Sequence, residues 1–243
     1  MNNRGILLDL DNTLYDYLAA HTPALEVTLN WLTEKLHRPR PDVQSAYTES
    51  RRRVNKELHG LASSHSRLLY FQGVCEQLET EPYEVAVEAQ DLYWREFFRH
   101  MILRPGVLDF LSAMKGTPIA IVTDLTTRIQ FQKITHLKLA PLLQAIVTSE
   151  EAGHEKPHAR IFELAATKLQ TSPEDLCMIG DSWERDIQGA LKFGMRCYWF
   201  RDTAEKSDGS QMELHRNDRP DMVTEFTDFK SLTKILTELP DLV

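Results

Sequence analysis

Short apolar runs alternate with helical patterns in the second half of the chain, and this alternation is the strongest constraint on its fold. The runs occupy residues 119–123, 145–148, 177–180, 197–200 and 222–223. Parallel strands need a crossover connection, usually a helix, so strands and helices in turn predict a parallel sheet covered on both faces. Residues 5–10 fit a further strand that is buried in the same sheet. The sequence therefore predicts a doubly wound α/β core.

A long helical region, roughly residues 18–99, interrupts this alternation. Apolar residues recur there at helical spacing, as in PALEVTLNWLTEKLH and PYEVAVEAQDLYWREFF, and strand signals are almost absent. We expect two units: an α/β core of residues 1–16 and 101–243, and a helical domain of residues 17–100 inserted after the first strand. The polar stretch of residues 203–220 is expected to be a surface loop.

Composition excludes several classes of protein. No apolar run approaches the ~18 residues of a membrane span, and the N-terminal MNNRG leads straight into a strand-like run, which leaves no room for a signal peptide. Three distant cysteines without a CxxC pair suit a reducing compartment. The net charge of -8 disfavours nonspecific binding of nucleic acid. We expect a cytoplasmic protein, monomeric or homodimeric, that binds neither membranes nor nucleic acid.

Polar residues gather where the predicted strands end, which is the edge at which open α/β sheets bind ligands. They are Asp9, Asp11, Thr123, Asp124 and Asp181, followed along the chain by Lys156 and Asp186. Buried carboxylates are strongly unfavourable without a partner, and crowded acids repel each other. A divalent cation removes this repulsion, and carboxylate oxygens match Mg²⁺, which also engages phosphate oxygens. A lysine and a hydroxyl nearby could hold a bound phosphate.

Four motifs within these segments resemble those of the haloacid dehalogenase-like hydrolases. They are DLDNT at residues 9–13, the threonine that ends IVT at 121–123, EKPHARIF around Lys156, and GDSWERD at 180–186. The resemblance covers essentially the whole chain, and the helical insertion looks like the cap domain of that superfamily. It implies a Mg²⁺-dependent phosphohydrolase acting on a small phosphorylated metabolite, such as a sugar phosphate or a nucleoside monophosphate. True dehalogenases of the superfamily lack the second aspartate, so Asp11 favours phosphate chemistry.

The resemblance also implies catalytic roles. Asp9 would attack phosphorus and form an aspartyl-phosphate, while Asp11 would protonate the leaving oxygen and then activate water. Thr123 and Lys156 would hold the transferring phosphoryl group, in a phosphate-binding loop that includes Asp124. Many relatives carry a small neutral residue at position 124, so we expect the Asp124 carboxylate to point away from the phosphate and to pair with Arg128 or another cation.

A metal site is implied by the same acids. Mg²⁺ would be ligated by Asp9, by the main-chain carbonyl of Asp11 and by Asp181. Asp186 would not contact the metal but would orient the residues that do. Mn²⁺ also accepts oxygen ligands, so the sequence leaves the preferred metal open. In the helical domain, the stretch HGLASSHSRLLY at residues 59–70 breaks the helical pattern. There we expect His65 and Arg67 to bind polar or anionic groups of the substrate.

Three other functions would account for some of these residues. A phosphomutase uses the same acids but returns the phosphoryl group to the sugar, and a noncatalytic binding module would have no need for both Asp9 and Asp11. The stretch from His154 to His158 fits the HExxH pattern of zinc peptidases. That chemistry needs both histidines on one continuous helix, and Pro157 would lie in its interior. We expect Pro157 in the first turn of the next helix instead, with His154 outside it.

Overall fold

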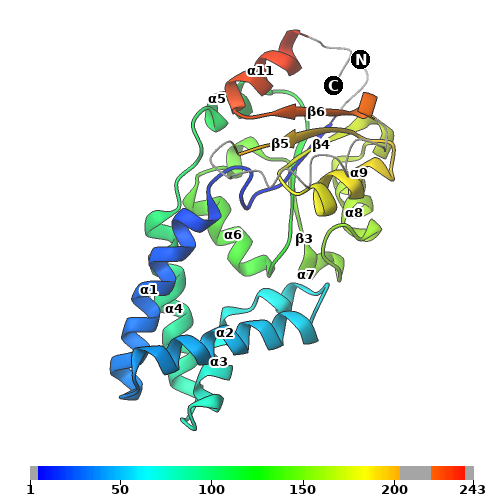
Figure 1. Cartoon of the computed structure of the whole chain (residues 1–243). Coiled ribbons are helices and arrows are strands. Elements are labelled where there is room, and N and C mark those ends of the chain that lie inside the picture. The colour runs from blue at the N-terminus through cyan, green and yellow to red at the C-terminus, as the bar shows by residue number, and fades with distance from the viewer. Residues whose placement is uncertain (1–4, 203–219, 239–243) are drawn as a thin grey trace.

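The computed structural model describes residues 5–202 and 220–238. Its sheet has six parallel strands in the order β3-β2-β1-β4-β5-β6, with β1 near the middle (Figure 1). In chain order the strands are β1 (Gly5–Leu8), β2 (Ile119–Thr123), β3 (Ala145–Thr148), β4 (Leu176–Gly180), β5 (Arg196–Phe200) and β6 (Val223–Phe226). This order, which reverses direction at β1, is that of the doubly wound nucleotide-binding folds. The predicted α/β core is confirmed.

Apolar residues on both faces make the central strands the core of the molecule. Successive side chains of a strand point to opposite faces, so Ile6 and Leu8 join one hydrophobic cluster while Leu7, between them, joins the other. The helices over the first face are α5 (Val107–Ala113), α6 (Thr127–His136) and α11 (Phe229–Glu238). Over the second lie α8 (Ala159–Leu169), the π-helical turn η4 (Trp183–Ile187) and α9 (Gln188–Leu191). Short elements complete the core: η2 (Ala140–Leu142), α7 (Ser149–Ala152), η3 (Pro173–Asp175) and η5 (Pro220–Met222).

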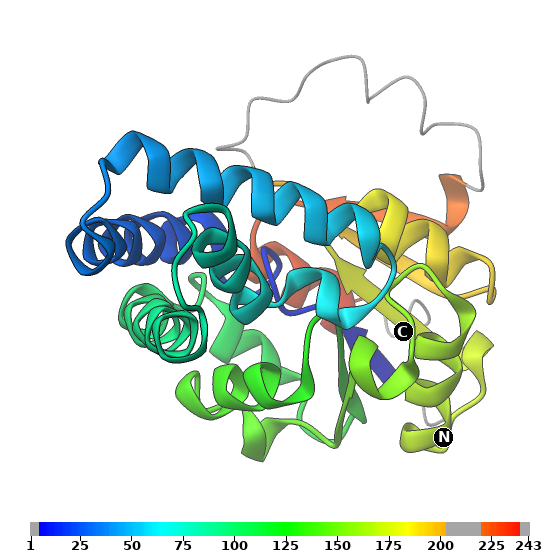
Figure 2. The same ribbon diagram turned by 90° about the horizontal axis from the view of Figure 1, so that it is seen from below.

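The helical insertion forms a separate layer, which we call the cap. It consists of α1 (Tyr17–Leu36), α2 (Arg40–Glu57), the short turn η1 (Ala62–His65), α3 (Arg67–Gln77) and α4 (Tyr83–His100). Helix α1 packs along α4, and α3 packs on both α2 and α4. Viewed from below, α2 and η1 extend from the α1 side across to the segment around α7 (Figure 2). There the amide of Glu155 donates to the carbonyl of Gly60 at 2.9 Å.

Two adjacent segments connect the core to the cap. The chain leaves the core through residues 11–15 and returns through residues 101–104. Tyr15 forms a single antiparallel bridge with Leu103, and the amide of Arg104 donates to the carbonyl of Leu14 at 2.8 Å. The guanidinium of Arg104 also donates to the carbonyl of Asn12 at 3.1 and 3.2 Å. The two connections are therefore tied together.

Strand boundaries differ from the sequence prediction at four places. Strands β4 and β5 each begin one residue earlier than predicted, at Leu176 and Arg196. The first strand ends at Leu8, so Asp9 lies just beyond it, and β6 runs from Val223 to Phe226 where only residues 222–223 were predicted. Residues 203–219, most of the predicted polar loop, lie outside the described part of the chain. Among the described helices, none has both the length and the hydropathy that a bilayer crossing requires.

Candidate active site

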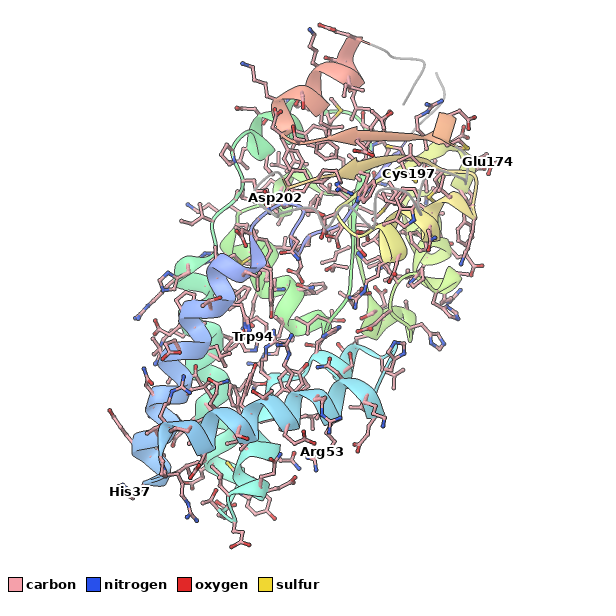
Figure 3. The ribbon with its side chains drawn as sticks, in the orientation of Figure 1. His37, Arg53, Trp94, Glu174, Cys197 and Asp202 are labelled. Atoms are coloured by element: carbon pink, nitrogen blue, oxygen red, sulfur yellow. The ribbon has the colours of Figure 1, made fainter. Side chains whose placement is uncertain are left out.

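A cavity of about 310 Å³ lies between the carboxyl ends of the strands and the cap. All nine of the predicted site residues line it, seven from the core and two from the cap. The core contributes Asp9, Asp11, Thr123, Asp124, Lys156, Asp181 and Asp186, and the cap contributes His65 and Arg67. Trp94 of α4, labelled in Figure 3, also lines the cavity where the cap meets the core. The fold thus brings together side chains that are distant in sequence.

Asp9 is held at the floor of this cavity by two other motifs. Its side chain is buried, and Oδ1 accepts a hydrogen bond from Nζ of Lys156 at 2.5 Å. The Thr13 hydroxyl lies 2.8 Å from Oδ2 of Asp9 and 3.0 Å from Oδ1 of Asp181, so it can donate to either carboxylate. The turn that makes this possible passes through Asn12, whose φ of 67° is left-handed, a conformation that asparagine tolerates well. Asp9 is therefore fixed in orientation but accessible from the cavity.

Lys156 neutralises part of the negative charge at this floor. Its ammonium contacts Asp9 and, at 2.7 Å, Oδ1 of Asp186, and it donates to the carbonyl of Val122 at 3.0 Å. Burial alone would lower the pKa of Lys156, but Asp186 and Asp9 outweigh this effect and raise it well above the ordinary value. Lys156 is therefore a permanent cation next to the Asp9 carboxylate.

The carboxylates of Asp9, Asp181 and Asp186 form a cluster that fits a metal ion. One oxygen from each lies within 4.8 Å of the other two. Burial, together with the charges of Asp9 and Asp186, raises the pKa of Asp181 to about 8. Burial likewise raises the pKa of Asp9 to about 6, although Lys156 opposes the shift. The cluster offers three oxygen donors, and its negative charge exceeds what Lys156 can offset. Such a set of donors matches the ligands of Mg²⁺.

Gly180 allows Asp186 to approach this cluster. A Cβ atom at position 180 would lie 2.7 Å from Cβ of Asp186 and nearer still to its carboxylate. Oδ2 of Asp186 accepts from the amide of Ser182 at 3.0 Å, which fixes the loop that carries Asp181. Glycine is therefore required at the start of the GDSWERD motif because any larger residue would collide with Asp186.

Asp11 points to a different group of partners, which the sequence did not predict. Both of its carboxylate oxygens accept from Nζ of Lys133, at 2.6 and 2.8 Å. Tyr15 donates its hydroxyl hydrogen to Oδ1, and Nε2 of Gln130 donates to Oδ2 at 3.2 Å. Burial would raise the pKa of Asp11, but the charge and hydrogen bonds of Lys133 outweigh it, so this pKa is lowered. Hydrogen bonds from three side chains therefore fix the position of the Asp11 carboxylate beside the buried Asp9.

The loop after β2 carries Thr123 and Asp124. Nε2 of Gln130 donates to the Thr123 hydroxyl at 2.7 Å, and that hydroxyl donates to the carbonyl of Asp124 at 3.4 Å. Oδ1 of Asp124 accepts from the amide of Lys156 at 2.9 Å, and Oδ2 lies 3.5 Å from Nη1 of Arg185. Asp124 thus pairs with a cation, which is Arg185. Its carboxylate ties the second motif to the third.

His65 and Arg67 stand on the opposite, cap side of the cavity. Nε2 of His65 lies 2.9 Å from Oε1 of Glu155, which is a contact between cap and core. Arg67 is 5% exposed, and it contacts the hydroxyls of Tyr17 and Tyr93. Both side chains line the cavity opposite the acids of the core.

The HExxH stretch does not form a zinc-peptidase helix. Helix α8 begins at Ala159 and His158 is its N-cap, so the two histidines do not share a helix. Their rings stack with centroids 3.9 Å apart. Pro157 lies before the helix and not in its first turn, so that detail of the prediction was wrong. His154 does lie outside the helix, as expected.

Comparison with known proteins identifies the family. A model of the haloacid dehalogenase-like hydrolases matches residues 4–194. The chain belongs to this family. A ribulose-1,5-bisphosphate 5-phosphatase from Halopiger xanaduensis is 32% identical over 236 residues, covering 93% of this chain and 99% of the relative. A glyceraldehyde 3-phosphate phosphatase from Methanothermobacter thermautotrophicus is 24% identical over 96% of this chain and 99% of its own length.

Solved structures share the fold of this haloacid dehalogenase-like hydrolase. A 2-haloacid dehalogenase from Pseudomonas syringae has a TM-score of 0.76 at 21% identity, over 98% of this chain and 99% of the other. A phosphatase of the family from Thermococcus onnurineus has a TM-score of 0.71 at 19% identity, over 96% of this chain and 97% of the other. These structures show the shared fold, and the curated relatives named as phosphatases place the chain in the phosphatase branch of the family.

Proposed function

We propose that this phosphatase is Mg²⁺-dependent and hydrolyses a small sugar phosphate through an aspartyl-phosphate on Asp9. The observation that carries the proposal is the pair of carboxylates at the cavity floor. Asp9 is fixed by Lys156 and Thr13, whereas Asp11, two residues on, is held by Lys133 and Gln130. Their different partners separate the two acids, so one can attack phosphorus while the other exchanges protons.

The proposed reaction has two steps. A carboxylate oxygen of Asp9 forms a bond to phosphorus as the bond to the sugar oxygen breaks, and Asp11 gives that oxygen a proton. Asp11 then takes a proton from water, which attacks phosphorus, and the acyl-phosphate bond to Asp9 breaks. The low pKa of Asp11 suits its role as base in the second step. In the first step, the negative phosphate beside Asp11 opposes Lys133 and favours the protonated acid.

Other residues would hold the phosphoryl group during both steps. Lys156 supplies a fixed positive charge. The Thr123 hydroxyl would exchange its long hydrogen bond to the Asp124 carbonyl, at 3.4 Å, for one to a phosphate oxygen. Mg²⁺, held by Asp9, Asp181 and Asp186, would neutralise phosphate charge and orient the group for in-line attack. In this proposal residues 17–100 are the cap, and they close over the substrate and exclude bulk water.

The nature of the relatives favours a sugar phosphate as substrate. The two relatives compared above are named for ribulose-1,5-bisphosphate and glyceraldehyde 3-phosphate, which are phosphorylated sugars. A cavity of about 310 Å³ suits a molecule of this size, and its charged walls suit a polar one. The aromatic Trp94 and Tyr17 also line it, and either could pack against a sugar ring.

Release of inorganic phosphate tests the proposal. We would measure it from trioses, pentoses and hexoses that carry phosphate, from nucleoside monophosphates and from p-nitrophenyl phosphate, each with Mg²⁺ and with EDTA. Release that needs Mg²⁺ and favours a sugar phosphate is expected, with a phosphorylated Asp9 trapped by acid quench. Isomerisation of a sugar phosphate without phosphate release, dependent on a bisphosphate, would instead identify a mutase and refute the proposal.

A further inference from the structure

The two walls of the cavity carry opposite charges. Core residues contribute five carboxylates and three cations, whereas the cap contributes two arginines, a histidine and no acid. The cap arginines are Arg51 at the C-terminal half of α2 and Arg67 at the start of α3. The charge on the core side is explained by the metal cluster and the transferring phosphate. The charge on the cap side has no role in that chemistry.

Arg67 is a buried cation without a carboxylate partner in the described part of the chain. Nη1 donates to the carbonyl of His65 at 2.6 Å, and Nη2 contacts the hydroxyls of Tyr17 and Tyr93. The guanidinium lies 5.1–5.4 Å from the ring centres of Tyr70, Tyr93 and Trp94. Nε is buried and has no hydrogen-bond partner. Arginine is rarely buried unless it is paired, because desolvating the charge is unfavourable. The guanidinium of Arg67 therefore lacks an anionic partner, and an anionic group bound in the cavity would provide one.

Arg51 contributes a second unpaired charge to the same wall. Its neighbours on α2 are both used: Arg52 lies 2.7 Å from Glu49, and Arg53 lies 3.4 Å from Glu76. Arg53, labelled in Figure 3, points to the side of α2 away from the core. Arg51 has no ion pair within residues 5–202 and 220–238, and it lines the cavity. Three consecutive arginines thus have different surroundings, and one of them faces the active site.

His21 lies close enough to Arg51 and Arg67 for their charges to affect its pKa. Nδ1 of His21 lies 2.7 Å from the Tyr93 hydroxyl, to which Arg67 also donates. Burial, together with the charges of Arg67 and Arg51, lowers the pKa of His21 to about 3. A neutral histidine beside the two arginines adds no competing charge, so the positive potential of the cap wall comes from Arg51 and Arg67.

We infer that Arg51 and Arg67 form a subsite for a second anionic group, a phosphate or carboxylate, on the substrate whose reacting phosphate lies at Asp9. The inference rests on the proposed function. It narrows the substrate to a sugar bisphosphate or a phosphorylated sugar acid. Guanidinium groups bind both anions through paired N–H donors, and the Tyr17 hydroxyl lies at the same wall. The reacting phosphate is then selected at the core and the distal anion at the cap.

The test compares substrates that differ in the distal anion. We would measure kcat/KM with Mg²⁺ for ribulose 1,5-bisphosphate, ribulose 5-phosphate, 6-phosphogluconate and p-nitrophenyl phosphate. Wild type should prefer one of the two substrates with a distal anion, and the preferred one identifies that anion as phosphate or carboxylate. In Arg51→Gln, the ratio of kcat/KM for that substrate to kcat/KM for ribulose 5-phosphate should fall roughly 10- to 100-fold, the loss expected for one charge-assisted hydrogen bond.

Matched variants separate binding from folding. Arg52→Gln removes the same charge one residue along α2 but does not line the cavity, so its substrate ratio should equal that of wild type. Arg67→Lys keeps the charge and loses the planar fork, and should lower the ratio too. A thermal melt reports whether Arg67→Lys is folded. Arg51 is exposed on its helix, so Arg51→Gln tests the inference even if Arg67→Lys unfolds.

The outcomes distinguish this inference from the proposed function. If p-nitrophenyl phosphate is hydrolysed but no substrate with a distal anion is preferred, or if Arg51→Gln leaves the ratio unchanged, the subsite is refuted while the phosphatase activity stands. If no substrate is hydrolysed, the proposed function fails. Calorimetric titration with ribulose 1,5-bisphosphate then decides: weaker binding to Arg51→Gln than to Arg52→Gln supports the subsite, and equal or absent binding refutes it.

Discussion

Replacing Lys133 by methionine tests whether the clamp on Asp11 matters for catalysis. Lys133 is 1% exposed and lies 5.6–5.8 Å from the ring centres of Tyr15, Trp94 and Phe97. Methionine has a similar length and packs well against aromatic rings. The substitution therefore removes the ammonium and its two hydrogen bonds to Asp11 without opening a cavity.

The loss of stability should be moderate. Removing one partner of a fully buried ion pair is destabilising by about 3–5 kcal/mol. The Asp11 side chain is 28% exposed and keeps its contacts with Gln130 and Tyr15. Water can therefore solvate the remaining carboxylate, and we expect a decrease of about 1–2 kcal/mol in the free energy of unfolding. For a chain of this length that corresponds to a fall of about 2–8 °C in Tm.

The effect on turnover should be larger and should depend on pH. Without Lys133, burial dominates and raises the pKa of Asp11, so the carboxylate that acts as base forms only at higher pH. The acid limb of kcat should therefore move to higher pH. We expect kcat on a sugar phosphate to fall by about 10²-fold, within the range for loss of general acid–base catalysis. The fall should be similar for p-nitrophenyl phosphate, because the attack of water on the aspartyl-phosphate, the step that needs the base, is common to both substrates.

The assays are thermal unfolding followed by circular dichroism, and kcat against pH for both substrates. Lys168→Met is the matched control: Lys168 lies 2.7 Å from Glu151 in a partly exposed pair. Such surface pairs contribute about 0–1 kcal/mol, so this variant should keep the wild-type profile. A Lys133→Met enzyme with unchanged kcat and an unshifted acid limb would refute the role given to Lys133.

Three further predictions concern the metal cluster and the nucleophile. Asp9→Asn should abolish phosphate release and leave the circular dichroism spectrum unchanged. Once deamidation of the asparagine has been excluded, release at the wild-type rate would contradict this prediction. Because the pKa values of Asp9 and Asp181 are raised to about 6 and about 8, the metal-free folded state binds more protons than the unfolded state between about pH 4 and 8. Its Tm should fall as pH rises through this range, and Mg²⁺ should raise Tm more at pH 8 than at pH 6; equal increments would count against the cluster as the site. Gly180→Ala should push Asp186 from Lys156 and destabilise the fold by about 1–3 kcal/mol, with loss of activity; unchanged kinetics would show that Asp186 can move without consequence.

Strands with a clear apolar run could be predicted from the sequence. The bounds predicted for β2 and β3 are those observed, because each is a short apolar run with polar or turn residues at its end. The sequence was less informative for β6, where VTEF is only partly buried and contains a glutamate. Only Phe226 of this strand is buried, so its apolar signal is weak.

Most of the site was predictable because its residues stand in motifs, and His65 and Arg67 were predicted from the break in the helical pattern of the cap. Gln130, Lys133 and Arg185 were missed, since their roles depend on how α6 and η4 pack against the strand ends. A signal was present for two of them. Gln130 and Lys133 are three residues apart, so they share a face of α6, and Ile134 beside them is buried. Polar residues on the buried side of a helix need partners, and here the partners are Asp11 and Thr123.

The paired connections between core and cap have a consequence for how such enzymes diversify. Both connections pass within one small region, where Arg104 joins the outgoing and returning segments. A different helical insertion could be exchanged there while the carboxylates of the core keep their positions. One condition limits the exchange: Trp94 and Phe97, which surround Lys133, come from α4 of the cap. A replacement cap that changes substrate preference must therefore rebuild this aromatic wall, or the acid–base group is altered along with the specificity.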